Sequence, residues 1–518
     1  MNSNLVKKIF KILEKSLYIL LILVYTYFFV LRLGFEFRFP IAYDSPDFQA
    51  IGRGIVNGFY PFRDFWEVKP IGIYLLHYIS YSLTDTLIIS HVFLIFCYIS
   101  LFLFPIIFFL IKVPRKKRTL SLFVISVALG SLVAVYADLR GGRLLPDIFG
   151  IFFSCLYILF INSSFFIKKR KLSYFIAGFL MCIACNFKEP YLFSIIASSL
   201  IFSNSFKDFL RKFFIPFLVA CVLGGVFLLS LGLLKDYFEY LYYMVFFLSV
   251  ADGNNIFMRT FININHIFNN LNLAFKFSGF VFYLLFLFPF IEVTQKYKNI
   301  ANRKKYILIR FLVLIFALYL TVMAVRSSGY HYSQHNSFAV PFIFALSLYF
   351  IKNVINFKND FRKIYIFVFN IILTITLFFL PIKGIVIEDW SDMFLCKNIK
   401  DEAEYIDNVL DKLDEKTYVF LGSCGHHILG FTRHSPKGKY AFQVRNWNAE
   451  KLPNFYESIV DNVKNAKLVV FDSYFNKKLQ YQIEPILNNA FTTDIPNSLK
   501  GIKKPYSRYK IYFSKKIS

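Results

Sequence analysis

Apolar segments recur along the first three quarters of the chain and are separated by short polar stretches. Many of them hold about 20 residues, enough for a helix to cross a hydrocarbon layer roughly 30 Å thick. The pattern predicts about eleven membrane-spanning helices. They lie at 15–33, 86–111, 119–137, 147–166, 172–186, 190–204, 213–234, 273–293, 306–325, 338–351 and 364–382. The sequence therefore predicts a polytopic α-helical membrane protein.

The composition agrees with this interpretation. Of the 518 residues, 57% are hydrophobic and 20% are aromatic, which is more apolar surface than a soluble domain carries. The net charge of +27 would suggest nucleic acid as the partner of a soluble protein. Here the basic residues form short clusters between the apolar segments, so membrane lipids are the expected partner and nucleic acid is not.

The basic clusters predict which side of the membrane each loop faces, because cytoplasmic loops are enriched in lysine and arginine. With the N-terminus in the cytoplasm, the cytoplasmic segments hold about 25 basic residues and the outward loops about 10. The clusters lie at 7–15, 112–118, 168–171, 207–212, 296–305 and 352–363. An odd number of spans then places the C-terminal segment outside, in a multi-pass protein of the inner (cytoplasmic) membrane.

One apolar segment, residues 70–83, is only about 14 residues long, which is short for a span. If it crossed the membrane, the basic cluster at 114–118 would face outward. We therefore expect this segment to lie in the outer membrane interface as an amphipathic helix, together with residues 48–58. The first outward loop, 34–85, is then long and acidic.

The composition changes after the last predicted span, where charges of both signs mix and helical spacing alternates with strand-like spacing. Helical spacing is found at 402–413 and 455–466, and strand-like spacing at 416–423 and 466–473. This alternation predicts a small open-sheet α/β domain. We expect a transmembrane domain over 1–383 and an extracytoplasmic α/β domain over 384–518.

Ionisable residues collect where the predicted helices meet the outside. Such residues are costly near a bilayer, so a cluster of them at one face is a candidate functional site. The candidates are Asp44, Asp47, Glu67 and Lys69 in the first outward loop, Arg143 and Asp147 in the second, Lys188 and Glu189 in the third, and His331, Tyr332 and His335 in the fifth. Carboxylates beside several cations fit a reaction in which a base activates an acceptor while the cations hold a departing phosphate.

Several of these residues lie in segments that resemble a known family. The segments are YDSPDFQAIGRGIVNGFYPFRDFWEVKPIGIYLLHYIS, ADLRGGRLLPDIFG, NFKEPYLF, GYHYSQHNSFAVPF and YVFLGSCGHHILGFTRHSPKGKYAF. They are similar to segments of the GT-C glycosyltransferases, a group that includes protein O-mannosyltransferases and lipid A aminoarabinose transferases. The first loop and the stretch around Arg143 and Asp147 carry the most specific part of the resemblance.

The resemblance implies a GT-C-like fold and an inverting glycosyltransferase, with a hexose or a pentose as the sugar. The donor would be a polyprenyl-phosphate-linked sugar, and the acceptor a glycolipid, a cell-surface glycan or a protein. Roles are implied for nine residues: Asp44 and Asp47 in catalysis, Lys69, Arg143 and Lys188 at the donor phosphate, and Glu67, Asp147, His331 and Tyr332 at the substrates. Many members of the group carry Asp-Glu at the acidic site, whereas here Ser45 follows Asp44, so which of Asp44 and Asp47 is the base stays open.

Structural roles remain open for the same residues. Asp44 is suited to cap a helix that begins at Ser45. Lys69 is placed to extend its ammonium to the interface as lysines there do. Arg143 and Asp147 are one helical turn apart and suited to an ion pair.

A metal is not demanded by this chemistry, because cations already bear the charge of a leaving phosphate. His331 and His335 are four residues apart and suited to hold a divalent metal on a helix, but no HExxH pattern accompanies them. No cofactor is therefore required, although a divalent metal remains an alternative.

Two other classes of protein compete with the enzyme. A transporter or flippase of lipid-linked sugars would show internal repeats and charges near the bilayer midplane. The sequence shows no such repeat, and its charges lie at one face. A membrane-anchored receptor would leave the acidic first loop unexplained.

The charge pattern predicts the topology directly. A reporter fused after residue 116 should be cytoplasmic, and reporters fused after residues 60 and 450 should be outside, because the basic clusters fix the cytoplasmic loops. Paired alkaline phosphatase and green fluorescent protein fusions measure this. A cytoplasmic reporter at 450 would contradict both the odd number of spans and the outer location of the site.

Overall fold

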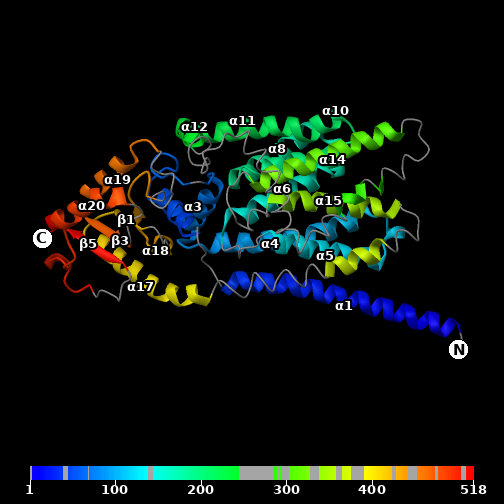
Figure 1. The fold of residues 1–518 in the computed structure, drawn as a ribbon, viewed down its shortest axis with the longest axis horizontal. Coiled ribbons are helices and arrows are strands. Elements are labelled where there is room, and N and C mark those ends of the chain that lie inside the picture. Colours follow the sequence, from blue (N-terminus) through cyan, green and yellow to red (C-terminus); the bar gives the residue numbers. More distant parts are fainter. Residues whose placement is uncertain are drawn as a thin grey trace.

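The computed structural model of the chain is an elongated, mostly helical molecule with a small sheet at one end (Figure 1). It describes residues 3–38, 45–67, 69–137, 144–243, 285–289, 291–292, 303–326, 338–356, 365–374, 390–422, 427–441, 452–472, 477–502 and 509–517. The N-terminus lies at one end of the long axis, and the sheet with the C-terminus lies at the other.

Helices account for most of the described chain before residue 390. They are α1 (Ser3–Arg38), α2 (Ser45–Val56), α3 (Gly72–Thr84), α4 (Ile88–Lys112), α5 (Leu120–Tyr136), α6 (Pro146–Ile161), α7 (Ser164–Lys168), α8 (Arg170–Phe187), α9 (Tyr191–Phe202), α10 (Phe206–Phe209), α11 (Ile215–Ser230), α12 (Leu234–Tyr243), α14 (Arg303–Arg326) and α15 (Val340–Asn353). A π-helical turn, Leu210–Phe214, joins α10 to α11. Each predicted span overlaps a helical segment among the described residues.

Three helices are long and apolar enough to cross a membrane, judged by length and composition among the described residues: Lys11–Gly34, Ile88–Lys112 and Phe206–Ser230. Shorter apolar helices are Leu120–Val135, Pro146–Ile161, Tyr191–Phe202, Val340–Asn353 and Tyr365–Thr374. The number of spans therefore stays a prediction. Many large apolar side chains of α1, α4 and α11 are exposed, as expected of helices that face lipid.

The first loop contains the two short helices that the sequence predicts, α2 and α3. They pack closely, because a side chain at Gly52 would overlap the Cβ atom of His77 and approach its backbone carbon to 3.1 Å. His77 in turn joins α3 to α4 through a 3.1 Å hydrogen bond between its Nδ1 atom and the Ser90 hydroxyl. Burial lowers the pKa of His77 to about 3, with a further contribution from His91, so the buried ring is neutral.

The end of the molecule beyond residue 390 is built around a five-stranded mixed sheet in the order β2-β1-β3-β5-β4. The strands are β1 (Thr417–Leu421), β2 (Ser435–Pro436), β3 (Leu468–Phe471), β4 (Phe491–Thr492) and β5 (Lys510–Ser514). The helices are α17 (Trp390–Lys412), α18 (His427–Phe431), α19 (Phe455–Lys464) and α20 (Lys477–Ala490). β1 pairs in parallel with β2 and β3, whereas β5 is antiparallel to β3 and β4.

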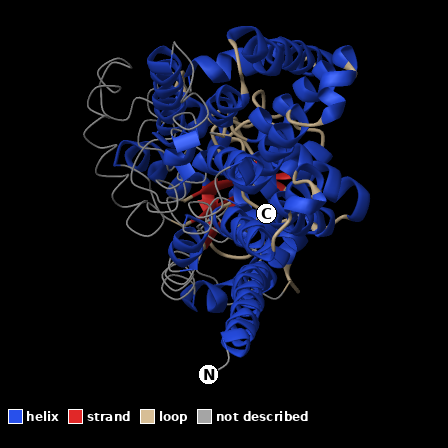
Figure 2. Cartoon of the chain, turned by 90° about the vertical axis from the view of Figure 1, so that its right-hand side faces the viewer, coloured by secondary structure: helices blue, strands red, loops and turns tan. Residues whose placement is uncertain are grey.

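This sheet contains the two strands that the sequence predicts, at β1 and β3. Figure 2 views the molecule from the end that carries the N-terminus and shows the strands lying behind the helices. The sheet is thus separate from the apolar helix bundle. The predicted domain boundary at 384 falls outside the described residues and stays a prediction.

The C-terminal unit docks on the first loop, and α2 lies between α3 and α18. The Arg53 guanidinium group donates a hydrogen bond to the Thr432 carbonyl oxygen and lies 4.3 Å from the centre of the Tyr81 ring. Asn57 donates to the Ser435 hydroxyl at 3.1 Å. Nine of the twelve residues of α2 are buried as a result. The sequence predicts α2 as a helix in the membrane interface; the structure encloses most of it in protein.

Candidate functional site

The site lies where the first loop meets the ends of α8 and α6. Gly72, the first residue of α3, packs against the last turn of α8 so closely that a Cβ atom there would lie 2.6 Å from the Asn186 carbonyl oxygen. Any larger residue would push α3 away from α8. This contact holds the segment that carries Lys69 against the turn that carries Lys188 and Glu189.

A buried ion pair joins α6 to the turn between α8 and α9. The Lys188 ammonium group lies 2.9 Å and 3.0 Å from the two carboxylate oxygens of Asp147. Both side chains are only 9% exposed. The local structure favours each charge: Asp147 follows Pro146 in the first turn of α6, and Lys188 is the C-cap of α8. Helix dipoles stabilise acids at N-termini and bases at C-termini.

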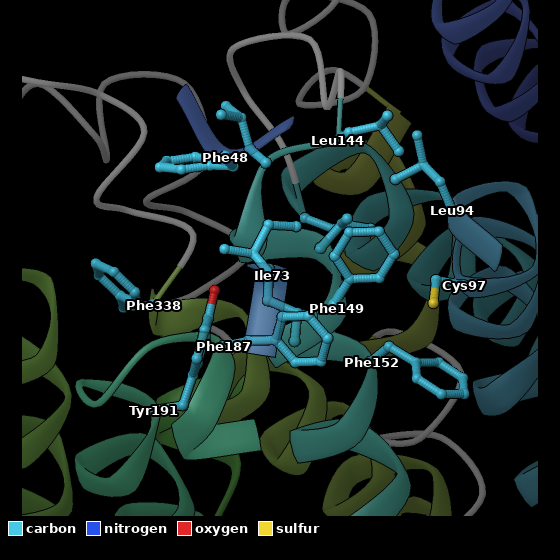
Figure 3. Packing of buried hydrophobic residues seen from close by; sticks show 14 of the residues in the cluster. Phe48, Ile73, Leu94, Cys97, Leu144, Phe149, Phe152, Phe187, Tyr191 and Phe338 are labelled. Carbon is cyan, nitrogen blue, oxygen red and sulfur yellow. The ribbon is translucent and has the colours of Figure 1, made fainter. Parts of the chain in front are cut away.

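Aromatic side chains surround this pair and limit its exposure to water. The Tyr191 hydroxyl donates to the Asp147 carbonyl oxygen at 2.9 Å, and its ring meets that of Phe338 edge to face with centres 5.0 Å apart. The Lys188 ammonium lies 4.9 Å from the centre of the Phe338 ring. Figure 3 shows Tyr191 and Phe338 with the stacked rings of Phe149 and Phe187 nearby. The low local dielectric strengthens the ion pair and raises the cost of losing either partner.

Two charged groups at the site are not enclosed in this way. Lys69 is half-buried, and among the described residues its ammonium has no hydrogen-bond or ion-pair partner. Glu189 is exposed to solvent, yet desolvation by the protein around it raises the pKa of its carboxyl group. A hydrogen bond from its own backbone N–H opposes that rise, followed by the charges of Lys69 and Lys188. The carboxyl group of Glu189 is thus close to protein atoms, although its side chain is exposed.

Two buried tyrosines connect the remaining carboxylates to Glu189. Burial raises the pKa of Tyr74 well above its ordinary value, and the charges of Glu67, Glu189 and Asp47 raise it further. The Tyr74 hydroxyl donates to the Lys69 carbonyl oxygen at 3.0 Å. Burial also raises the pKa of Tyr240, followed by the charge of Glu189. Asp47, Glu67 and Glu189 therefore lie in one electrostatic neighbourhood.

The structure thus brings together five of the residues that the sequence singles out as a site, with Glu189 beside them. We refer to these six as the charged cluster: Asp47, Glu67, Lys69, Asp147, Lys188 and Glu189. Asp47 is fully buried and Glu67 is 5% exposed. The other predicted site residues, Asp44, Arg143, His331 and Tyr332, lie outside the described residues, and their roles stay predictions.

Three features of the site were not predicted from the sequence. The sequence offers Arg143 as the partner of Asp147, whereas the described partner is Lys188, 41 positions away. Glu189 is among the ionisable residues that the sequence places on the outer side, but no role was predicted for it. Tyr240 is a further addition, since an isolated tyrosine in an aromatic-rich chain carries no signal. The one usable signal is the sequence Lys188-Glu189-Pro190, which places two opposite charges in a turn between two apolar helices.

Metal-ligand geometry was sought over the same part of the chain. Within the described residues, no group of three or more histidine, cysteine, aspartate or glutamate side chains is arranged to hold a metal ion. Asp44, His331 and His335 are not among those residues.

Fold and site together describe a mostly helical protein with membrane-length apolar helices and a charged cluster at one end. Two solved structures are similar to it, both of ArnT from Cupriavidus metallidurans. The one bound to undecaprenyl phosphate has a TM-score of 0.45 and 12% identity, and the one in the apo state has 0.44 and 10%. Each alignment covers 96% of this chain and 98% of the other. No protein-family model and no curated protein sequence matches the chain.

ArnT is a lipid A aminoarabinose transferase with the GT-C fold, the group that the first loop resembles.

The buried ion pair predicts a large effect on stability. Lys188→Ala should lower the free energy of unfolding by about 3–5 kcal/mol, because it leaves the Asp147 carboxylate buried without its counter-ion. The double variant Lys188→Met with Asp147→Leu should recover most of that loss, since it removes both charges at similar volume. Thermal unfolding of the detergent-purified protein measures both. Equal melting temperatures for Lys188→Ala and the unmodified chain would show that the pair does not stabilise the fold.

Proposed function

We propose that the protein is an inverting glycosyltransferase that moves a sugar from a polyprenyl-phosphate donor to an acceptor on the outer face of the cytoplasmic membrane. The observation that carries the proposal is the charged cluster, in which a lysine without a described partner lies among carboxylates at one end of a bundle of apolar helices. A lipid-linked donor presents its phosphate at such a place, because its tail occupies the bilayer while its head group reaches the interface.

The two lysines of the charged cluster have different proposed roles: Lys188 stabilises the structure, and Lys69 binds the substrate. Lys188 is already paired with Asp147 at 2.9 Å and is buried. Lys69 is half-buried and without a partner among the described residues, so its charge is available to a ligand. A phosphate is the group that such an ammonium binds, as a point charge with up to three hydrogen bonds. Lys69 is therefore our choice for the donor phosphate, with Arg143 as a second cation.

The reaction is a displacement at the anomeric carbon. Asp44 takes the proton of an acceptor hydroxyl, and the hydroxyl oxygen forms a bond to the anomeric carbon from the face opposite the phosphate. The bond between that carbon and the phosphate oxygen breaks, and the electron pair leaves with the lipid phosphate. Lys69 stabilises the charge that develops on the leaving oxygen. The configuration at the anomeric carbon is inverted.

The burial of Asp47 supports Asp44 as the base. Asp47 is fully buried in the first turn of α2, where the helix dipole stabilises its negative charge. A base must reach the proton that it removes in the bound complex, which a fully enclosed carboxylate does poorly. Asp44 precedes α2 by one residue, and Asp47 would fix the start of that helix and hence the position of Asp44.

Removing the lysine that is proposed to bind the phosphate should weaken the use of the donor. Lys69→Ala should lower transfer by about 100-fold or more, because one cation directed at a developing phosphate charge contributes about 3 kcal/mol. Lys69→Arg should retain part of the activity, since the charge survives in a different geometry. Release of undecaprenyl phosphate from labelled lipid-linked sugars by purified protein measures this.

Lys235→Ala is the matched control, because Lys235 is an exposed lysine at the same end of the molecule, on α12. A normal rate for Lys69→Ala would place the phosphate on another cation, Arg143 before Lys188.

Variants of Asp44 and Asp47 distinguish a catalytic base from a carboxylate with a structural role. Asp44→Asn keeps the size of the side chain and its ability to cap a helix, but it cannot accept a proton at neutral pH. Transfer should fall by roughly 100-fold or more, with unchanged yield and melting temperature. Asp47→Asn should be milder in rate but should lower stability. The control is Asp85→Asn, in the same loop, where φ is 52° and asparagine fits equally well.

A reversal of the two results would make Asp47 the base. If neither change slows transfer while both lower the folded yield, the loop carboxylates are structural.

A further inference from the structure

The C-terminal unit carries a cleft that shares no residue with the charged cluster. Its volume is about 720 Å³, within the range of about 300–1,000 Å³ that small-molecule sites occupy. It is lined by residues 501–502 and by the second half of α17, the helix that runs from the helix bundle toward the sheet (Figure 1). The lining residues from α17 are Asp401, Glu404, Tyr405, Asn408, Asp411 and Lys412.

Two carboxylates of the cleft are available to a ligand. The α17 residues that line it recur every three or four positions, so they share one face of the helix. Asp401 and Glu404 are exposed on this face, and neither has an ion-pair or hydrogen-bond partner among the described residues. Asp411 differs, because its carboxylate lies 2.7 Å from the Arg433 guanidinium group. The free negative charge of the cleft therefore lies at Asp401 and Glu404, one helical turn apart.

We propose that this cleft binds a small organic cation, whose primary ammonium group is held between Asp401 and Glu404. An ammonium group donates three hydrogen bonds, and its bonds to carboxylates are among the strong ones. The cleft extends to the last turn of α17, where the negative end of the helix dipole also favours a cation. The chain as a whole has the opposite balance, with 59 basic and 32 acidic residues. The cleft is thus a local reversal of charge.

Tyr405 supplies a second, independent observation that points to a ligand. It lines the cleft, its side chain is 3% exposed, and its hydroxyl has no hydrogen-bond partner in the described part of the chain. A buried hydroxyl without a partner is costly to the fold. The hydroxyl is shielded from bulk water, so only a ligand that reaches the floor of the cleft would gain this hydrogen bond. Such a site favours a compact molecule over a long chain.

The other end of the cleft limits what accompanies the ammonium group. Lys412 is exposed there, without a partner among the described residues, and it would repel a second cation. The Asn408 amide is also exposed and can both donate and accept hydrogen bonds. A Cβ atom at Gly501 would meet nothing within 4 Å, so this side of the cleft is open. The ligand expected is one ammonium group with neutral polar groups beside it, such as hydroxyls.

The test compares glucosamine with glucose, which match in size and differ in that an ammonium group replaces one hydroxyl. The full-length protein is placed in nanodiscs of phosphatidylcholine, whose zwitterionic head groups carry no net charge to attract the probe. Calorimetric titration at about pH 6, below the pKa of an amine, measures both affinities. Glucosamine should bind about 10-fold tighter than glucose or more, because hydrogen bonds between charged groups are the stronger ones.

Asp401→Asn and Glu404→Gln should each weaken the binding of glucosamine by about 10-fold and leave glucose unchanged, because each removes one charge and keeps the side-chain size. The control is the double variant Glu457→Gln with Asp461→Asn. These are two exposed carboxylates one turn apart on α19, outside the cleft. The control should bind glucosamine as the unmodified chain does.

Two further variants change the cleft in other ways. Lys412→Gln should tighten the binding of glucosamine by up to about 5-fold, because a like charge near the ammonium group is lost. A gain of affinity cannot result from poor folding. Tyr405→Phe should weaken binding by about 3- to 10-fold, since one neutral hydrogen bond is lost. Unchanged binding in Tyr405→Phe would show that the ligand does not reach the floor of the cleft, against the proposal.

Ethanolamine distinguishes two sources of the same chemistry. Equal affinity for ethanolamine and glucosamine would indicate that the ammonium group is recognised without the ring, as on a lipid head group, whereas weaker binding of ethanolamine would indicate an amino sugar. The inference is wrong if glucosamine and glucose bind equally, or if the α19 control weakens binding as much as the α17 variants. These outcomes are independent of the proposed sugar transfer, which the Lys69 and Asp44 variants test.

Discussion

The close contact between Gly72 and the last turn of α8 is the constraint on which the site depends. With a Cβ atom at 2.6 Å from the Asn186 carbonyl oxygen, no other residue fits there without moving a helix. The contact fixes where α3 begins, and α3 then reaches α4 through the hydrogen bond between His77 and Ser90. It also decides that Lys69, on a segment between helices, lies beside the turn of Lys188 and Glu189. A loop on its own would not hold a cation at a fixed position beside a carboxylate from another part of the chain.

The second level of organisation is the enclosure of α2. The helix is covered by α3 on one side and by α18 on the other, so the start of α2 is positioned by packing more than by charge. Arg53 strengthens this arrangement, because its guanidinium group contacts both the Tyr81 ring and the Thr432 carbonyl oxygen. Lys439 adds a further contact between the C-terminal unit and the first loop, because its ammonium nitrogen lies 4.3 Å from the centre of the Trp66 ring. The C-terminal unit is therefore part of the framework of the site, and removing it would expose the helix that carries Asp47.

Local patterns in the sequence predicted individual helices and strands, but they did not predict which distant residues contact one another. The strand-like spacing around β1 and β3 and the short apolar stretch at α3 are local signals, and each corresponds to an element of the expected type. The partner of Asp147 could not be predicted in this way. Arg143 is four positions away in sequence, whereas Lys188 is 41 positions away, at the end of α8. Contacts between distant residues follow from packing, and packing is not encoded in the period of a single segment. The burial of α2 was not predicted for the same reason, since Thr432 is 379 positions from Arg53.

The difference between the two lysines makes Lys69 the better candidate for the leaving phosphate of the proposed reaction. The charge of Lys188 is already balanced by a bidentate carboxylate in a nearly dry setting, and a phosphate could reach it only by separating that pair. The Lys69 ammonium, half-buried and without a described partner, has its hydrogen bonds still to make. Catalysis requires interactions that strengthen as charge develops, and not interactions that are complete before the reaction begins. A lysine positioned by the backbone contact at Gly72, and without a hydrogen-bond or ion-pair partner among the described residues, would meet that requirement in the proposed reaction. The buried pair between Lys188 and Asp147 joins the start of α6 to the end of α8, and in the proposed reaction it would keep them together as charge develops on the leaving oxygen.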